Sequence, residues 1–151
     1  MERHIHFQDF EKSFWQLSRK MENVWKEIYT KTFPGSQSRI MYLLEQNGPL
    51  RMSDLANELH ITAGAVTTAS NILIKNEYIM RLRNDEDRRV VHLDLTEKGR
   101  SKLNELRETG KEMMKLVFKD LSDEELKNML AAFKQASANI DSMQDPQSQR
   151  K

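Results

Sequence analysis

Hydrophobic residues recur every three or four positions along the first part of the chain. This stripe consists of Phe7, Phe10, Phe14, Leu17, Met21, Val24 and Ile28. Steps of three and four keep one face of an α-helix apolar, and helices with such a seam pack against other helices. Pro34-Gly35-Ser36 then ends the pattern, because proline and glycine break helices. A second helix is expected over about residues 37–46, with its buried side at Ile40, Leu43 and Leu44.

The same spacing returns in two segments near the end of the chain. The first contains Leu103, Leu106, Gly110, Met113 and Val117, and the second contains Leu126, Met129, Phe133, Ala136, Ile140 and Met143. Between them, Ser122 and Glu125 have the spacing of a capping box, in which each side chain binds the other residue's backbone N–H. Residues 145–151 contain no hydrophobic side chain and are expected to form a disordered tail.

The pattern therefore predicts one long amphipathic helix at the start of the chain and two at its end. Periodicity alone leaves their partners open. The stripes could pack within one chain, or against a second copy, because terminal helices have little else to cover them in a small domain.

Residues 53–76 are typical of two short helices joined by a tight turn. Ser53 and Thr62 are the expected N-caps, and His60-Ile61 forms the turn. Buried positions are expected at Leu55, Ala56, Leu59, Val66, Ala69 and Leu73. This is the core spacing of a helix-turn-helix, whose second helix can enter the major groove of DNA.

Two strand-like stretches, residues 78–83 and 90–95, follow this motif and are separated by a polar loop. In the second stretch Val91, Leu93 and Leu95 alternate with polar or smaller side chains, as in a strand with one buried face. A hairpin placed after a helix-turn-helix is a wing. The expected fold is therefore mainly α with a small β-hairpin wing, a winged helix-turn-helix flanked by N- and C-terminal helices.

Composition removes several classes of protein. The chain has 151 residues, of which 38% are hydrophobic and 31% charged, so it can bury a core. It has no cysteine, which excludes disulfides, thiolate metal sites and a thiol-oxidation sensor. No apolar run approaches the roughly 18 residues of a membrane span, and no signal-peptide core is apparent. A cytoplasmic location without membrane association is expected.

No pattern typical of catalysis is present. A Gly-rich phosphate loop, a His-Glu-x-x-His motif and a nucleophile elbow are all missing, and Asp85-Glu86-Asp87 lies in a polar loop beside arginines. His4, His6 and Asp9 lack convincing ligand spacing, so no metal site is expected. We expect neither enzymatic activity nor a cofactor.

Charge is nearly balanced, with 24 Lys and Arg against 23 Asp and Glu. Any binding to DNA must therefore depend on where the charges lie. Arg88 and Arg89 at the wing tip suit a narrow, negative minor groove, because a guanidinium is planar and weakly hydrated. Asp87 would orient one arginine while the other reaches DNA. The alternative is a solvated loop of mixed charge.

Three stretches carry a resemblance to a known family. They are Asp54-Leu55-Ala56 with Ile61 and Val66, then Asp87-Arg88-Arg89-Val90-Val91, and then Leu93-Asp94-Leu95-Thr96-Glu97-Lys98-Gly99. These residues resemble the MarR family of bacterial transcriptional regulators, and the terminal helices extend the resemblance over nearly the whole chain. It implies an obligate homodimer on a pseudo-palindromic operator, usually acting as a repressor that a small ligand releases.

The resemblance also implies a division of the chain. Residues 36–96 would form the winged DNA-binding domain, and residues 1–33 and 97–144 the dimerisation region. The expected dimer contacts are Phe7, Phe10, Phe14, Leu126, Met129, Phe133 and Ile140. The effector would be a small aromatic or lipophilic molecule in a crevice beside the dimer helices. The aromatic residues that could line it are Trp15, Trp25, Tyr29 and Tyr42, whose alternative role is core packing.

The expected recognition helix departs from the family pattern. Thr68 and Ile72 stand where the family often has basic residues, and Glu77 stands where glycine is common. The helix residues expected at DNA are Ala63, Gly64, Ala65, Thr67, Thr68, Asn71 and Lys75. The wing and backbone contacts are expected from Asp87, Arg88, Arg89, Arg39 and Arg51.

Small uncharged side chains on this helix suggest the sequence that it reads. Asn71 can pair with adenine, and the methyl groups of Thr67 and Thr68 can meet thymine, so an A·T-rich operator is predicted. Alternatively, these small residues only let the helix approach the DNA backbone closely. A winged-helix module that binds protein rather than DNA is the other open function, because the helix is neutral and Glu77 adds an acid.

Overall fold

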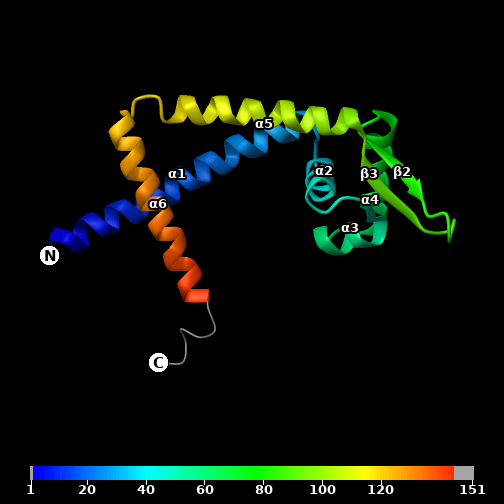
Figure 1. Ribbon diagram of the computed structural model, residues 1–151, viewed down its shortest axis with the longest axis horizontal. Coiled ribbons are helices and arrows are strands. Elements are labelled where there is room, and N and C mark those ends of the chain that lie inside the picture. The colour runs from blue at the N-terminus through cyan, green and yellow to red at the C-terminus, as the bar shows by residue number, and fades with distance from the viewer. Residues whose placement is uncertain (1, 145–151) are drawn as a thin grey trace. The chain divides into compact units, whose positions relative to one another are not determined.

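The computed structural model describes residues 2–144, with side chains described from residue 6 onward (Figure 1). The predicted tail, residues 145–151, and the side chain of His4 lie outside this part. The elements in chain order are α1 (Glu2–Thr32), α2 (Ser36–Asn47), β1 (Leu50–Arg51), α3 (Met52–Leu59), α4 (Ala63–Lys75), β2 (Ile79–Arg83), β3 (Val91–Leu95), α5 (Glu97–Val117) and α6 (Asp123–Gln144). The fold is mainly helical with a small antiparallel sheet, as predicted. None of the described helices has the length and hydrophobicity needed to cross a membrane.

The chain divides into two compact units, residues 1–112 and the part that follows. One hydrophobic core holds the first unit together. Its buried side chains are Phe33, Ile40, Met41, Leu44, Leu55, Leu59, Val66, Ala69, Leu73, Ile79, Leu93, Leu95, Leu103 and Leu106. The predicted helix-turn-helix core is confirmed, except that Ala56 is only half-buried.

The sheet has three strands in the order β1-β3-β2, all antiparallel. Arg81 lies opposite Leu93 in the hairpin, and Leu50 lies opposite Leu93 on the other side. The predicted two-stranded wing was therefore incomplete. Strand β1 was not predicted, because its two residues are too few to show an alternating pattern. The hairpin extends beyond α3 and α4 (Figure 1).

The helix-turn-helix begins differently from the prediction. Ser53 is not the N-cap of α3: the helix follows β1 directly, and Arg51 occupies the capping position. The backbone N–H of Arg51 donates to Oδ2 of Asp54 over 3.3 Å. Thr62 caps α4 as predicted, since its Oγ1 accepts from the N–H of Ala65 at 3.1 Å.

Several close contacts join the turn after α4 to the start of α5. Thr96 donates its hydroxyl to the carbonyl of Glu77 and accepts from the N–H of Gly99 at 3.0 Å. A Cβ on Gly99 would lie 2.1 Å from the carbonyl oxygen of Tyr78, so only glycine fits. Thr96 and Gly99 of the Leu-Thr-x-x-Gly pattern are therefore structural residues that position the sheet against α5.

Two long-range contacts hold α5 in the first unit. The ring of Trp25 in α1 lies over Gly110, where an added Cβ would come within 2.1 Å of it. Arg107 forms an ion pair with Glu45 of α2, and this carboxylate raises the pKa of Arg107 through a hydrogen bond and its charge.

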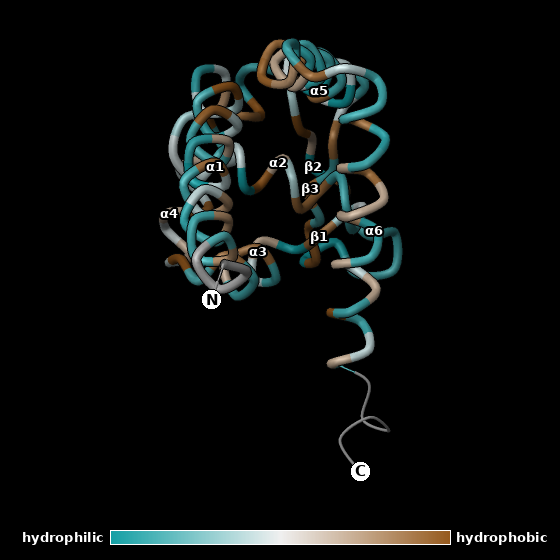
Figure 2. Tube along the Cα trace, turned by 90° about the vertical axis from the view of Figure 1, so that its left-hand side faces the viewer, coloured by the Kyte–Doolittle hydropathy of each residue, from teal (hydrophilic) through white to brown (hydrophobic). Residues whose placement is uncertain are grey.

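Large apolar side chains remain exposed on α1 and α6. Phe7, Phe10 and Phe14 are exposed on α1, and no residue of α6 is buried within the described chain. Hydrophobic and hydrophilic residues follow one another along α6 (Figure 2). The predicted capping box at its start is confirmed: Ser122 N–H donates to Oε2 of Glu125 at 2.8 Å, and Glu125 N–H donates to Oγ of Ser122 at 3.2 Å.

Candidate nucleic-acid interface

Helix α4 shows one face to the core and the other to solvent. Val66, Ala69, Ser70 and Leu73 are buried, which sets the rotation of the helix about its axis. The opposite face exposes Ala63, Gly64, Thr67, Thr68, Asn71, Ile72 and Lys75. Of the residues predicted at DNA, Ala65 is only half-exposed, because it lies next to the buried Val66.

The hydroxyl groups of Thr67 and Thr68 both donate hydrogen bonds to backbone carbonyls of α4. Thr67 Oγ1 donates to the carbonyl of Ala63, and Thr68 Oγ1 donates to the carbonyl of Gly64, each over 3.0 Å. These side chains therefore offer a methyl group and an oxygen lone pair rather than a donor. A methyl group can meet the methyl group of thymine, and the predicted contacts to thymine stay a prediction.

An arginine of the wing strand reaches the exposed face of α4. Arg81 in β2 donates from Nη2 to Oδ1 of Asn71 over 3.0 Å. Arg81 is not among the residues that the sequence predicts at DNA. Alternation along β2 places Arg81 on the same face of the strand as Ile79 and Arg83. Which helix lies against that face is set by tertiary packing, so the sequence pattern could not predict the contact with α4.

The wing loop is exposed throughout residues 83–89. Asp87 Oδ1 accepts from the backbone N–H of Arg89 at 3.0 Å and lies 3.6 Å from its Nε. The Arg89 side chain is nevertheless 96% exposed, so this ion pair orients the guanidinium without burying it. Within the described chain no ion pair engages Arg88.

The two predicted backbone contacts outside the wing differ in their surroundings. Arg51 is exposed in β1. Arg39 in α2 donates from Nη2 to the carbonyl of Leu59, the last residue of α3, over 2.9 Å. Its guanidinium therefore satisfies a carbonyl at a helix end that the helix itself leaves unpaired.

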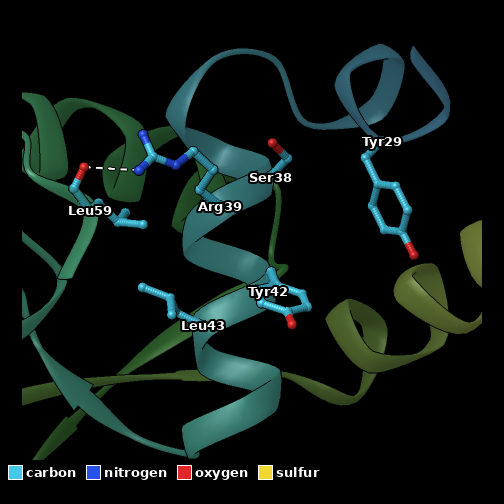
Figure 3. Close-up of a pocket in the computed structure, with 6 residues that line it drawn as sticks. All are labelled: Tyr29, Ser38, Arg39, Tyr42, Leu43 and Leu59. Atoms are coloured by element: carbon cyan, nitrogen blue, oxygen red, sulfur yellow. Dashed lines mark hydrogen bonds between the residues drawn. The ribbon is translucent and has the colours of Figure 1, made fainter. Parts of the chain in front are cut away.

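Arg39 also lines a cavity of about 350 Å³ beside α2. The other lining residues are Tyr29, Ser38, Tyr42, Leu43 and Leu59, and Figure 3 shows Arg39 reaching from α2 to the Leu59 carbonyl. A larger open hollow next to it adds Trp25. Trp15 lines neither: it is exposed on α1, where its ring meets Phe14 edge-on at 5.1 Å. Of the four aromatic residues that could line a crevice, Trp25, Tyr29 and Tyr42 border these two hollows.

The chain is similar in sequence to known transcriptional regulators. The family model described as MarR family matches residues 34–91. YpoP of Bacillus subtilis, an HTH-type transcriptional regulator, is 27% identical over 125 residues, which cover 83% of this chain and 89% of YpoP. FarR of Neisseria gonorrhoeae, another HTH-type regulator, is 35% identical over 98 residues, or 63% of this chain and 67% of FarR. MdtR of Bacillus subtilis, an HTH-type transcriptional repressor, is 31% identical over 91 residues, or 60% of this chain and 59% of MdtR.

The chain belongs to the MarR family.

Solved structures agree with this assignment over a longer stretch. YusO of Bacillus subtilis has a TM-score of 0.71 and 26% identity, covering 87% of this chain and 94% of YusO. FabT of Streptococcus pneumoniae, solved in complex with DNA, has a TM-score of 0.56 and 25% identity, covering 89% of this chain and 99% of FabT. Members of the MarR family are winged-helix transcriptional regulators, and the family is not one of enzymes.

The structure bears on all three departures from the family pattern. At Thr68 and Ile72 the helix lacks basic side chains, yet Arg81 brings a guanidinium to the same face. Glu77, at the position where glycine is common, has a φ of +62°. Glycine adopts this left-handed backbone region without steric cost, whereas the side chain of Glu77 makes the backbone strained there.

Proposed function

We propose that this MarR-family chain binds double-stranded DNA sequence-specifically as a homodimer on a pseudo-palindromic operator and represses transcription. One observation carries the proposal: α4 exposes a face of small side chains, and the adjacent wing carries the exposed Arg88 and Arg89. FabT is bound to DNA in its solved structure, and MdtR is named a repressor. A regulator of this kind acts where the chromosome is, so the proposed location is the cytoplasm.

The helix and the wing would make different contacts. Residues of α4 would face the base edges in the major groove, with Thr67 and Thr68 meeting thymine methyl groups in an A·T-rich half-site. The remaining helix contacts would come from Ala63, Gly64, Ala65, Asn71 and Lys75. Arg88, Arg89 and Arg51 would contact phosphate or the minor groove, with Asp87 orienting Arg89. Arg39 would contribute only if it left the carbonyl of Leu59.

The dimer would cover the exposed stripes of the terminal helices, from residues 1–33 and 97–144, leaving residues 36–96 as the DNA-binding domain. Leu126, Phe133 and Ile140 are each exposed by 42% or more on α6. Phe7, Phe10 and Phe14 are similarly exposed on α1, whereas Met129 is half-buried. Apolar patches of this extent mark interaction surfaces in folded proteins.

A small aromatic or lipophilic effector would bind in the cavity beside α2. Tyr29, Tyr42 and Leu43 give it mainly apolar walls, and its volume of about 350 Å³ suits a small organic molecule. Arg39 connects this cavity to the helix-turn-helix through the Leu59 carbonyl. An effector that draws Arg39 away would free the last turn of α3 and shift the presentation of α4.

The first experiment measures fluorescence anisotropy of the duplex upstream of the chain's own gene and of a scrambled duplex, over a series of salt concentrations. Tight binding to the first alone, weakened by salt, is expected. Arg89→Ala is expected to weaken every duplex alike and to lower the salt slope by about 0.9, whereas Lys20→Ala on α1 leaves binding unchanged. Absence of binding to any duplex selected from a random pool would favour the protein-interaction module instead.

A further inference from the structure

The hydrogen bond between Arg81 and Asn71 joins the wing strand to the recognition helix at its exposed face. The Nη2 of Arg81 lies 3.0 Å from Oδ1 of Asn71, and both side chains are exposed. Within α4 the nearest cation on this face is Lys75, one turn further along. Arg81 is therefore the guanidinium that the fold places beside the C-terminal half of α4.

The chemistry of arginine determines how the Asn71 amide is turned. A guanidinium has five N–H donors and no acceptor, so the amide oxygen, not the NH₂ group, must face it. Once Oδ1 accepts from Arg81, the amide offers its two N–H donors on the other side. The remaining N–H groups of Arg81 are donors as well. The pair thus presents hydrogen-bond donors to a partner.

Two neighbouring hydrogen-bond donors can distinguish guanine from adenine in the major groove. Guanine offers two adjacent acceptors, N7 and O6, whereas adenine offers the acceptor N7 beside the donor N6–H₂. Pairing Asn71 with adenine would need its carbonyl oxygen to accept from N6 as well as from Arg81, which already occupies one of its two lone pairs and fixes the orientation of the amide. The geometry favours guanine at this position.

We propose that Arg81 and Asn71 act as one composite base reader, which selects a guanine at one symmetric position of each otherwise A·T-rich half-site. Arg81 is the specificity-determining residue of the pair, because it supplies donors and fixes the amide of Asn71. This inference rests on the proposed binding to DNA. It replaces the adenine contact that the sequence suggested for Asn71 and leaves the contacts of Thr67 and Thr68 unchanged.

Arg83 offers a matched control on the same strand. It lies two residues beyond Arg81 in β2, on the same side of the alternation, and is exposed. In the described part of the chain no hydrogen bond or ion pair links it to α4. Loss of its charge should therefore affect general attraction to phosphate without changing base preference.

The test selects duplexes from a random pool with the full-length wild type, Arg81→Met and Arg83→Met. The wild type should enrich sites with one invariant guanine in each half, and Arg83→Met should enrich the same sites with lower affinity. Arg81→Met should lose the guanine preference, with adenine tolerated there because Oδ1 is released. Replacing that guanine by 7-deazaguanine should weaken the wild type about tenfold and leave Arg81→Met unaffected.

Two results would overturn the composite reader while leaving the proposed function intact. They are wild-type sites that lack an invariant guanine, and identical base preferences for the wild type and Arg81→Met. If the wild type enriches no sequence at all, both proposals fail. Should Arg81→Met unfold, as judged by circular dichroism, Arg81→Lys keeps the charge but removes the planar fork, and it should lose the guanine preference with unchanged thermal stability.

Discussion

At the scale of single residues, the turn between α4 and β2 is closely constrained by its neighbours. Tyr78 donates its backbone N–H to the carbonyl of Leu73 and accepts from Thr96, and its own carbonyl faces Gly99. Glu77 just before it has a left-handed backbone. Thr96 ties this turn to the start of α5 through hydrogen bonds from its hydroxyl and its backbone N–H. Side-chain size and backbone φ therefore matter more here than hydrophobicity.

Gly99→Ala should destabilise the fold. The new methyl group would meet the Tyr78 carbonyl oxygen at 2.1 Å, so the turn or the start of α5 must move. A loss of about 2–3 kcal/mol in the free energy of unfolding is expected in urea titration. Gly64→Ala is the control, because its Cβ meets only Thr62 Oγ1 at 3.9 Å, and it should change stability little or raise it slightly.

Glu77→Gly should raise the stability of the protein. At a φ of +62° glycine escapes the steric cost that a side chain incurs, which exceeds the extra freedom it has when unfolded. We expect a gain of about 0.5–1 kcal/mol in chemical denaturation. Glu58→Gly, in the regular helix α3, should instead lose about 1 kcal/mol. A destabilised Glu77→Gly would show that the glutamate side chain has a role beyond this backbone position.

At the scale of elements, the helices were predictable wherever local chemistry decides them. Helix α6 begins at Asp123, directly after Ser122, because Ser122 and Glu125 satisfy each other's backbone N–H groups. Helix α3 shows the opposite case. Its start depends on β1, which exists only because Leu50 and Arg51 pair with a strand some forty residues later in the chain.

The start of α6 should weaken in acid. Hydrogen bonds from the backbone and side chain of Ser122 lower the pKa of Glu125. A carboxyl whose pKa is lower in the folded state stabilises the fold above its unfolded pKa, and this contribution is lost as the pH falls through the folded pKa. The difference in thermal midpoint between wild type and Glu125→Ala should therefore be largest near neutral pH and shrink below about pH 4.

Glu124→Ala serves as the control for this titration. It keeps the bonds between Ser122 and Glu125, so its midpoint should follow the wild-type curve in acid. A constant difference between wild type and Glu125→Ala down to pH 3 would mean that the charge of Glu125 has no part in the cap.

At the scale of the whole molecule, large apolar side chains on α1 and α6 remain exposed to solvent in the described chain. Phe14 on α1 and Phe133 on α6 are exposed by 44% and 54%. The compact core of the first unit already buries its own apolar residues without them. A second copy of the chain is the partner that the proposed function requires.

Phe133→Glu should separate the proposed dimer into monomers. Burial of one phenyl group contributes about 2 kcal/mol, and a two-fold interface contains it twice, so the dissociation constant should rise about a thousandfold. Analytical ultracentrifugation measures the change, and affinity for an operator should fall with it. Lys134→Glu, on the exposed polar side of α6, should leave the dimer intact. A monomeric wild type would refute the proposed assembly.

Most of this fold, and the surface on which its function is proposed, can be predicted from the amino-acid sequence. Helical periodicity, the Thr62 and Ser122 caps and the alternation of β3 depend on residues a few positions apart, so their pattern can be read directly from the chain. Five features could not be predicted in this way: strand β1, the start of α3, the hydrogen bond from Arg39 to Leu59, the position of Trp15 outside the cavity, and the hydrogen bond from Arg81 to Asn71. Each of these depends on which distant segments pack together, and no local spacing encodes that.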